Sequence, residues 1–207
     1  GNVTGGAYIG GLVGWDSGNS ISNCYSIGNV TGGNYAGGLV GFNSGSTISN
    51  CYSTGNVTGG IETGGLVGLD NEGTISNCYS TGTVISTGNS TGGLVGESSD
   101  TTISNCYSTK TVTGNIFTGG LIGVSSNSII FNCYSTGNVT GEDYAGGLVG
   151  NNWGGSNSNS FWDIDTSGQT TSAGGTGKTT AEMKMQSTYT DAGWTFPNPW
   201  LINPEMN

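Results

Sequence analysis

Apolar residues recur along this chain at an almost constant interval, separated by Gly, Asn, Ser and Thr. The phrase Asn-Cys-Tyr-Ser repeats every 27 or 28 residues, with its Cys at Cys24, Cys51, Cys78, Cys106 and Cys133. The phrase Gly-Gly-Leu-Val-Gly keeps the same interval, once with Ile for Val, and starts at Gly10, Gly37, Gly64, Gly92, Gly119 and Gly146. A fixed period of this length predicts one supersecondary unit stacked on copies of itself.

The unit at residues 37–63 divides into strands and turns. Residues 37–41, 47–53 and 56–58 are strand-like, and Gly, Asn and Ser separate them. No segment of the repeat has the 3.6-residue period of a helix. Strands that pair with their copies, parallel and in register about 4.8 Å apart, make each unit one coil. The sequence therefore predicts an all-β parallel β-solenoid of about six 27-residue coils.

The repeat loses its regularity after the sixth copy. Residues 159–162 read Asn-Ser-Phe-Trp where the repeat has Asn-Cys-Tyr-Ser, and no repeat follows Asp163. We predict solenoid repeats over residues 1–162 and a non-repetitive segment for capping and assembly over residues 163–207. A short helix is expected over residues 179–186, capped by Thr179 or Thr180.

Alternation along the strands indicates which side chains point inward. With Leu39 inward, Val40 and Phe42 point outward, and Glu97 at the Phe42 position favours this because burying an unpaired carboxylate is costly. In Asn-Cys-Tyr-Ser, Cys and Ser suit the interior and Tyr an outer face, although the opposite assignment is open. Three internal ladders are expected, of Leu (Leu12, Leu39, Leu66, Leu94, Leu121, Leu148), Ile (Ile21, Ile48, Ile75, Ile103, Ile130) and Val (Val30, Val57, Val84, Val112, Val139).

Charge is sparse and acidic. The 207 residues include 13 Asp and Glu, three Lys, no Arg and no His, for a net charge of −10. Nucleic acid is excluded as a partner because phosphates need a basic surface, and the apolar runs are too short for a membrane span. A chain without His lacks the commonest general base, so we predict a protein that is not an enzyme and needs no cofactor. The composition suits an extracellular location.

Three motifs suggest chemistry that a structural role explains better. The Cys side chains of successive coils are expected about 4.8 Å apart, which is wider than the Cβ separation of a disulfide. This spacing predicts a ladder of buried free thiols. Residues 172–179 resemble a phosphate-binding loop, but no buried strand precedes them, so a flexible Gly-rich loop is expected. The segment that starts with Asp163 and Asp165 resembles the beginning of a calcium-binding loop but lacks its final Glu. These residues are therefore a weak candidate for a metal site, and a solvated turn is the other interpretation.

An enzyme that degrades polysaccharides is one alternative function, because parallel β-helices host such sites. Glycoside hydrolysis needs two carboxylates close together. We expect the carboxylates of the repeats to be scattered through turns rather than paired across coils: Asp70, Glu72, Glu97, Asp100, Glu142 and Asp143.

Two exposed positions also repeat. The sequons for N-glycosylation are Asn2, Asn29, Asn56, Asn89 and Asn138. An outer Thr ladder, interrupted by Ile85, contains Thr4, Thr31, Thr58, Thr113 and Thr140. Regular Thr arrays can order water, so an ice-binding solenoid is the second alternative function, although Thr also simply suits a strand surface.

We also expect an apolar outer stripe, which the tail or a partner must cover. Its residues are Val13, Trp15, Val40, Phe42, Val67, Leu69, Ile122 and Val124, and the tail offers Met183, Met185, Trp194, Phe196, Trp200 and Leu201. The chain begins within a repeat, which leaves a coil edge unpaired. The interpretation is self-association into a fibre or layer through Trp15, Phe42, Leu69, Val124, Trp194, Phe196 and Trp200. Repeats missing upstream would explain the same edge equally well.

The two repeated phrases resemble those of the GLUG-repeat family, which is named for its Gly-Leu-small-apolar-Gly signature. The resemblance covers residues 1 to about 162. It implies a large secreted or surface-anchored protein of bacteria or archaea with a structural or adhesive role. As partners we expect further copies of the chain, or a polysaccharide or other ligand at a cell surface. The resemblance supplies no catalytic residues.

Overall fold

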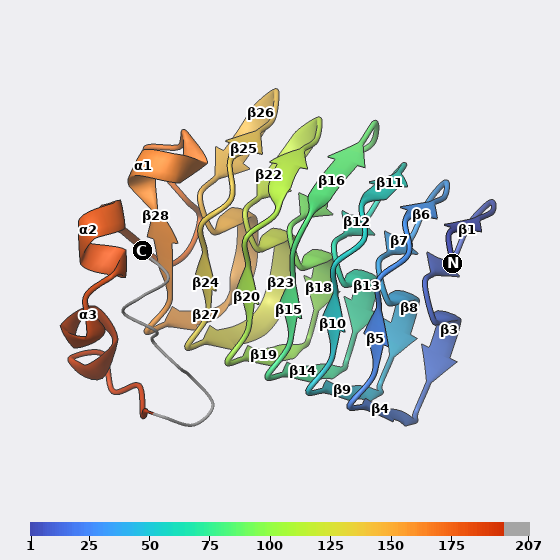
Figure 1. Cartoon of the computed structure of the whole chain (residues 1–207), viewed down its shortest axis with the longest axis horizontal. Coiled ribbons are helices and arrows are strands. Elements are labelled where there is room, and N and C mark those ends of the chain that lie inside the picture. Colours follow the sequence, from blue (N-terminus) through green and yellow to red (C-terminus); the bar gives the residue numbers. More distant parts are fainter. Residues whose placement is uncertain (197–207) are drawn as a thin grey trace.

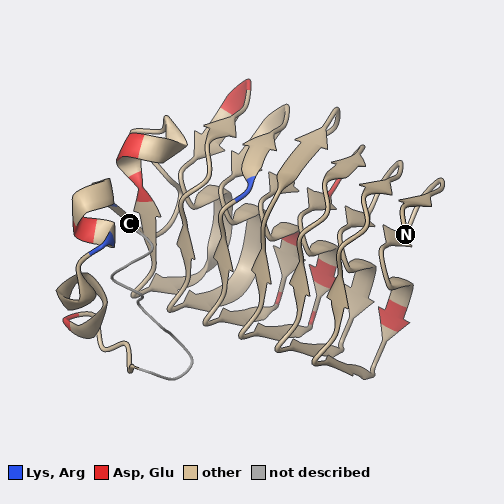
Figure 2. Cartoon of the chain, viewed as in Figure 1, with Lys and Arg blue, Asp and Glu red and all other residues tan. Residues whose placement is uncertain are grey.

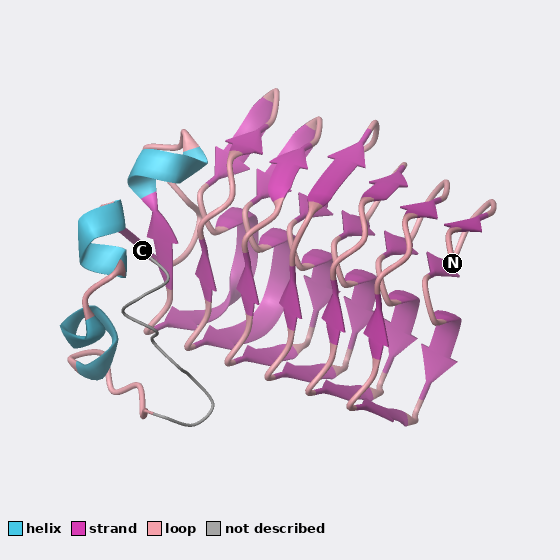
Figure 3. Ribbon diagram, viewed as in Figure 1, coloured by secondary structure: helices cyan, strands magenta, loops and turns pink. Residues whose placement is uncertain are grey.

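The computed structural model describes residues 1–196, which form a parallel β-solenoid of six coils with short helices at its C-terminal end (Figure 1, Figure 3). The coils begin at residues 1, 28, 55, 82, 110 and 137. The strands pair in parallel with their copies in the next coil, so that Val3 lies opposite Val30 and Tyr25 opposite Tyr52. The predicted fold class is therefore confirmed.

Each coil contributes to four sheets. The Val sheet consists of β1 (Val3–Thr4), β6 (Val30–Thr31), β11 (Val57–Gly59), β16 (Thr83–Ser86), β21 (Thr111–Thr113) and β25 (Val139–Thr140). The Gly sheet consists of β2 (Ile9–Gly10), β7 (Ala36–Gly37), β12 (Thr63–Gly64), β17 (Thr91–Gly92), β22 (Ile116–Gly119) and β26 (Asp143–Gly146).

The other two sheets complete the coil. The long sheet consists of β3 (Val13–Ser17), β8 (Val40–Ser44), β13 (Val67–Asn71), β18 (Val95–Ser99), β4 (Ser20–Ser22), β9 (Thr47–Ser49), β14 (Thr74–Ser76), β19 (Thr102–Ser104), β23 (Ile122–Phe131) and β27 (Val149–Ser158). The Tyr sheet consists of β5 (Tyr25–Ser26), β10 (Tyr52–Ser53), β15 (Tyr79–Ser80), β20 (Tyr107–Ser108), β24 (Tyr134–Ser135), β28 (Phe161–Asp163) and β29 (Thr176–Lys178).

The first four coils each have five short strands rather than the predicted three, because two predicted strands bend. Leu39 lies at one bend, between β7 and β8. Asn50 lies at the other, between β9 and β10, with a φ of 54°. Asn tolerates this left-handed conformation better than most residues. The same conformation occurs at Asn23, Asn77, Asn105, Asn132 and Asn159.

The bend at Leu39 overturns one predicted side-chain direction. Alternation does not run through a bend, so Leu39 and Val40 both point into the core, and neither is exposed. Val67 and Ile122 are buried in the same way, and the outward prediction for these residues is wrong. The Leu, Ile and Val ladders are buried as predicted from the second coil onward, whereas Leu12 in the first coil is 51% exposed. Each buried Leu, Ile or Val side chain stabilises the fold by about 1.5–3 kcal/mol.

The Tyr sheet has the predicted orientation. The Cys and Ser of Asn-Cys-Tyr-Ser point inward, and from Cys51 onward these Cys are buried. The Tyr rings stack along the outer surface with centroids 4.9–5.1 Å apart and planes within 3–7° of parallel. The stacked residues are Tyr25, Tyr52, Tyr79, Tyr107 and Tyr134.

A buried polar ladder runs beside the apolar core at one position of the long sheet. Its residues are Asp16, Asn43, Asp70, Ser98 and Ser125. The Asn43 side-chain amide donates to Asp70 Oδ1, while Asp70 Oδ2 and Asn43 Oδ1 are buried and have no hydrogen-bond partner among residues 1–196. Burial raises the pKa of Asp70 to about 7, although hydrogen bonds from Asn43 and Thr101 oppose the shift.

A fully buried lysine also interrupts the repeat. Lys110 stands where the coils before and after it have Gly28, Gly55, Gly82 and Gly137. Its side chain runs through the interior beside Gly65, and its ammonium donates to the Gly55 carbonyl at 2.7 Å. Burial lowers the pKa of Lys110 to about 8.

The last coil is closed by the segment that follows it. Trp162 belongs to the core and replaces the small inward Ser of the earlier coils. Ser172 Oγ accepts from the backbone N–H groups of Leu148 and Val149, and β29 pairs with β28 in the Tyr sheet. The predicted boundary after residue 162 therefore falls within β28.

Three short helices follow, α1 (Ile164–Ser167), α2 (Thr180–Met183) and α3 (Gln186–Thr190). Thr179 caps α2 as predicted, through a capping box with Glu182. Tyr189 and Trp194 pack against Phe161 and Tyr134. Residues up to 196 of the tail thus cover the end of the Tyr sheet rather than the Phe42 side of the rod, so of the two predicted covers for the outer stripe, tail or partner, this part of the tail is not the one.

Candidate functional site

Two neighbouring columns of side chains follow the corner between the Gly sheet and the long sheet, and together we call them the corner face. The Tyr8 column contains Tyr8, Tyr35, Glu62, Ser90, Phe117 and Tyr144. The Trp15 column contains Trp15, Phe42, Leu69, Glu97, Val124 and Asn151. All six residues of the Tyr8 column have a φ between 51° and 61°, so every coil has a left-handed residue at this position, two residues before the recurring Gly of its Gly-sheet strand.

Four aromatic rings cluster on the corner face in the first two coils. Tyr8 and Tyr35 stack with centroids 4.7 Å apart and planes 3° from parallel. Trp15 stacks on Tyr8 at 5.4 Å and meets Phe42 edge-on at 5.3 Å. Trp15 is nevertheless 60% exposed. The cluster therefore presents an accessible indole surface.

A second aromatic cluster lies on the corner face in the last two coils. Phe117 and Tyr144 have centroids 5.2 Å apart. Trp153 from β27 meets Phe117 edge-on at 5.5 Å and is 55% exposed. Aromatic rings thus stand near both ends of the face, with the third and fourth coils between them.

Two half-buried carboxylates occupy the corner face between the aromatic clusters. Glu62 and Glu97 lie on neighbouring coils and in neighbouring columns, the same diagonal relation that places the Tyr8 and Phe42 rings 6.1 Å apart. Ser90 Oγ donates to Glu97 Oε2 at 3.1 Å, whereas Glu62 Oε2 has no hydrogen-bond partner in the described chain.

The electrostatics of this pair follow from burial and mutual repulsion. Burial is the larger cause, and the Glu97 charge the smaller, of a Glu62 pKa raised to about 7. Burial also raises the pKa of Glu97. The Glu62 charge in turn raises the pKa of the Tyr35 hydroxyl. These groups therefore share one electrostatic environment.

The three Lys side chains of the protein lie away from the Glu62–Glu97 pair. Lys110 is buried against the Gly55 carbonyl, and Lys178 lies 3.7 Å from Glu182 in the cap. Lys184, the remaining one of the three Lys, ends α2. Figure 2 shows how thinly charge is spread over the described residues. The only ion pair of residues 1–196 is the one in the cap, so the Glu62–Glu97 pair is not neutralised within this part of the chain.

Comparison with known families agrees with this repeat geometry. The model of the GLUG motif matches residues 32–58, 59–85, 87–113 and 114–140, which together are more than half of the chain. The chain belongs to the GLUG-motif family. Each match runs once around the rod, from the Val sheet to the start of the next turn, so the GLUG motif corresponds to one coil.

A curated protein is similar to part of this chain. A protein of Evansella cellulosilytica described as "Putative Gly-rich membrane protein" is 47% identical over 51 residues. The match covers 25% of this chain and 6% of that protein. In the described residues of our chain, no helix is both long enough and apolar enough to span a bilayer.

The GLUG coils place the predicted outer stripe only partly at the surface. Trp15 is exposed, and Phe42 and Leu69 are partly exposed, which agrees with their predicted direction. Val124 is fully buried, so its assignment to an exposed assembly surface is wrong. In this coil the strand β23 is longer than its counterparts and pairs along its length with β27.

The tail residues proposed for assembly have other positions. Trp194 is buried, and its indole N–H donates to the Asn159 carbonyl at 2.8 Å. Phe196 is partly buried beside Tyr189. Trp200 lies outside the described residues.

The predicted scattering of carboxylates is wrong for two pairs. Glu72 and Asp100 occupy the same exposed turn of neighbouring GLUG coils, with φ angles of 57° and 53°. Glu62 and Glu97 form the diagonal pair of the corner face. Sequence reasoning missed Glu62, although its register with Tyr8 and Tyr35 was a usable signal.

Four of the five predicted sequons, at Asn2, Asn29, Asn56 and Asn138, lie with the Thr positions at one exposed place on the Val sheet, and their Asn and Thr, two residues apart, share its outer face. The fifth differs, because Asn89 lies between β16 and β17 and its Thr91 is buried in the Gly sheet. Thr4, Thr31 and Thr58 lie in register. The backbone N–H of Asn29 donates to Asn2 Oδ1, and the backbone N–H of Asn56 donates to Asn29 Oδ1, each at 3.0 Å. The sequon residues Asn2, Asn29, Asn56, Asn89 and Asn138 are exposed.

The structure gives Asp163 and Asp165 helix-capping roles. Asp163 Oδ1 accepts from the backbone N–H groups of Asp165 and Thr166, and Asp165 Oδ2 accepts from that of Thr180. Residues 1–196 contain no group of three or more His, Cys, Asp or Glu side chains placed to hold a metal. The residues that resemble a phosphate-binding loop instead close the last coil through Ser172.

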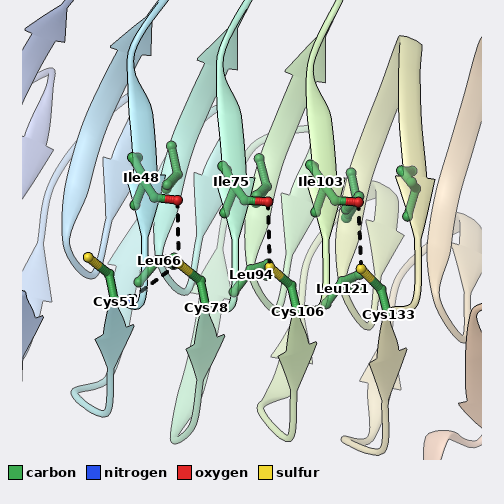
Figure 4. Close-up of a cluster of buried hydrophobic side chains, with 14 of the residues drawn as sticks. Ile48, Cys51, Leu66, Ile75, Cys78, Leu94, Ile103, Cys106, Leu121 and Cys133 are labelled. Atoms are coloured by element: carbon green, nitrogen blue, oxygen red, sulfur yellow. Dashed lines mark hydrogen bonds between the residues drawn. The ribbon is translucent and has the colours of Figure 1, made fainter. Parts of the chain in front are cut away.

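The Cys ladder consists of free thiols within the described chain. The thiols of Cys78, Cys106 and Cys133 donate to the carbonyls of the Ile ladder in the preceding coil at 3.7–3.8 Å (Figure 4). Burial, and next the hydrogen bond with Cys133, raise the pKa of Cys106, although the hydrogen bond with Cys78 opposes the shift. A protonated, buried thiol is a poor nucleophile, so this ladder supports packing.

Proposed function

We propose that this GLUG array is a non-enzymatic, extracellular structural or adhesive module. The observation that carries the proposal is the regular display of side chains: each outward column repeats at the strand spacing along a rod whose core is continuous. A rod of this kind presents many copies of one contact in a row. It therefore suits multivalent attachment, in which weak contacts add up.

Family membership and composition support the extracellular location. The similar protein of Evansella cellulosilytica is described as a "Putative Gly-rich membrane protein". A chain with a net charge of −10 and three Lys suits an exterior surface. Proteolysis of intact cells, followed by immunoblotting, tests this location: loss of the protein without lysis agrees with it, and full protection contradicts it.

The exposed surface of the first coil is the proposed site of self-association. Leu12 is 51% exposed, whereas its copies from Leu39 to Leu148 are fully buried, because a neighbouring coil covers them. One further coil stacked here, from a second copy of the chain or from repeats that precede this sequence, would bury Leu12 and pair the strand edges. Residues 171–176 already occupy the opposite edge with their own hydrogen bonds, so we place the contact at the first coil.

Light scattering over a range of concentrations tests this contact. Leu12→Lys should weaken association, and Ile85→Lys is the matched control because Ile85 is similarly exposed in the middle of the Val sheet. A monomer at high concentration for the unmodified chain would contradict self-association. Equal effects of both variants would contradict the first coil as the contact.

Ice binding is a second candidate because the Asn and Thr array of the Val sheet is flat, exposed and in register. Neighbouring hydroxyls are about 4.8 Å apart across strands. Thermal hysteresis should then be measurable, and Thr58→Tyr should reduce it while Thr54→Tyr, outside the array, should not. Absence of hysteresis in the unmodified protein would dismiss this candidate.

A further inference from the structure

We propose that the corner face binds a linear polysaccharide that carries protonated amino groups, with Glu62 and Glu97 contacting the amines and the flanking aromatic clusters contacting the sugar rings. The inference rests on the proposed adhesive function and names its ligand. The observation behind it is a pair of half-buried carboxylates between two aromatic clusters along one face of a rod.

No cation of the described chain lies beside the carboxylate pair. Glu62 and Glu97 repel one another, and Glu62 Oε2 has no hydrogen-bond partner in residues 1–196. The one salt bridge of these residues is in the cap. A ligand ammonium placed between the two carboxylates would relieve the repulsion and complete their hydrogen bonding. A polysaccharide with carboxylate or sulfate groups would be repelled instead.

The aromatic clusters favour a sugar chain over a simple cation. Trp15 and Trp153 stand near opposite ends of the corner face, and more than half of each side chain is exposed. Exposed aromatic rings bind the apolar faces of sugars and also attract cations. A chain that lies along the rod can touch both clusters and the carboxylates, whereas a small amine reaches only one of them.

The backbone of the corner face argues against an extended peptide as the ligand. Peptide strands gain affinity by pairing with an open sheet edge. Here the backbone N–H groups of Tyr8, Glu62 and Ser90 already donate to the next coil. Recognition on this face therefore depends on side chains, which is how hydroxyl and amino groups of a sugar are bound.

The decisive experiment is calorimetric titration of the full chain with an oligosaccharide of β-1,4-linked glucosamine. We expect binding that weakens with added salt, and about tenfold weaker binding for Glu62→Gln combined with Glu97→Gln. The matched control combines Glu72→Gln with Asp100→Asn, which removes the same charge from the same coils outside the corner face. Trp15→Ala should also weaken binding, and circular dichroism should show that each variant keeps its fold.

Three results would overturn the proposal. The N-acetylated form of the same oligosaccharide should bind poorly, and equal binding would remove the role of the amine. A lysine oligomer that binds as tightly would show a purely ionic surface without sugar recognition. Equal losses in both double variants would show dependence on net charge alone.

The same samples separate this inference from the broader function. Absence of binding would contradict the proposed identity of the ligand but would leave the proposed structural or adhesive role intact. Release of new reducing ends from the oligosaccharide would instead overturn the non-enzymatic role, because it would reveal hydrolysis by the carboxylate pair.

Discussion

Replacing Asp70 with Asn should stabilise this protein at neutral pH. Asp70 is fully buried, and its Oδ2 atom and the Oδ1 atom of Asn43 have no hydrogen-bond partner in the described residues. A proton on Asp70 would supply a donor inside this buried ladder, where Asn43 Oδ1 has none, while Asp70 Oδ1 still accepts from the Asn43 amide nitrogen. An Asn side chain supplies that donor without a proton, and Asn43 already fits the same position one coil earlier.

The magnitude follows from the pKa shift. Burial raises the pKa of Asp70 from 3.8 to about 7 in the folded state. The folded protein then holds a proton that the unfolded chain releases, so the free energy of unfolding falls as the pH rises from about 4 to about 7. At about 1.4 kcal/mol for each pH unit, the loss attributable to Asp70 reaches about 4 kcal/mol above pH 7. Asp70→Asn should recover most of this at pH 8 and little at pH 4.

Urea denaturation at a series of pH values checks this difference. Glu62 and Glu97 also have raised pKa values, so the unmodified protein loses stability for more than one reason, and the comparison with the Asp70→Asn variant isolates one residue. Asp100→Asn in an exposed turn is the control and should leave the profile unchanged. If Asp70→Asn raises stability equally at pH 4 and pH 8, or lowers it at pH 8, the argument from the buried charge fails.

Three further predictions concern the interior. Lys110→Met should raise stability at pH 7 by about 2 kcal/mol. The lowering of the Lys110 pKa from 10.5 to about 8 means that the buried charge costs about 3 kcal/mol, which the variant recovers, but the variant also loses about 1 kcal/mol with the hydrogen bond to Gly55. This gain should disappear in denaturation curves as the pH rises from 8 to 10.5, because the unfolded Lys then also loses its proton; a gain that persists would contradict it. Gly64→Ala should cost more than about 4 kcal/mol in thermal denaturation, because its Cβ would overlap the Val67 carbonyl, whereas Gly45→Ala should cost about 1–2 kcal/mol for its φ of 68° alone. A thiol reagent should modify Cys24 in the folded protein and the remaining Cys only after unfolding, and rapid reaction of all five would show that the ladder is open.

The period of the sequence was enough to predict the architecture because a solenoid has little freedom once its repeat is known. Equivalent residues in parallel, in-register strands must lie about one strand spacing apart. The inward Leu, Ile and Cys positions then follow from a few alternating segments. The Tyr stack follows from the same argument, since an outward Tyr in five successive coils has its own copies as nearest neighbours.

The bends were not predictable from alternation. Asn50 turns the chain through a left-handed conformation that Asn tolerates but does not require, so the same letters also read as one continuous strand. Leu39 lies at a bend without any Asn, and its position turned Val40 inward. The packing of Tyr189 and Trp194 on Phe161 could not be predicted from the sequence either, because a non-repetitive tail has no equivalent positions from which neighbours can be inferred.

The Glu62–Glu97 pair was missed for a different reason. The two residues occupy different positions of the repeat, separated by one coil and one column, and a comparison of equivalent positions never brings them together. The Tyr8–Phe42 contact follows the same diagonal and shows that such neighbours touch. Columns beside a corner must therefore be read together as a surface.

Lys110 departs from the repeat near the middle of the rod, and stacking explains why it is tolerated there. It places an ionisable group in the interior, between coils that are packed on both sides. In a stack whose stability is a sum over coils and their interfaces, a central coil with two packed interfaces can hold a residue that would melt a terminal one. Departures inside the rod thus lower its stability at neutral pH, whereas Glu62 and Glu97 change only its surface. Glu62 and Glu97 contribute nothing to the stacking of the core, and this is the reason to look for their role in a ligand.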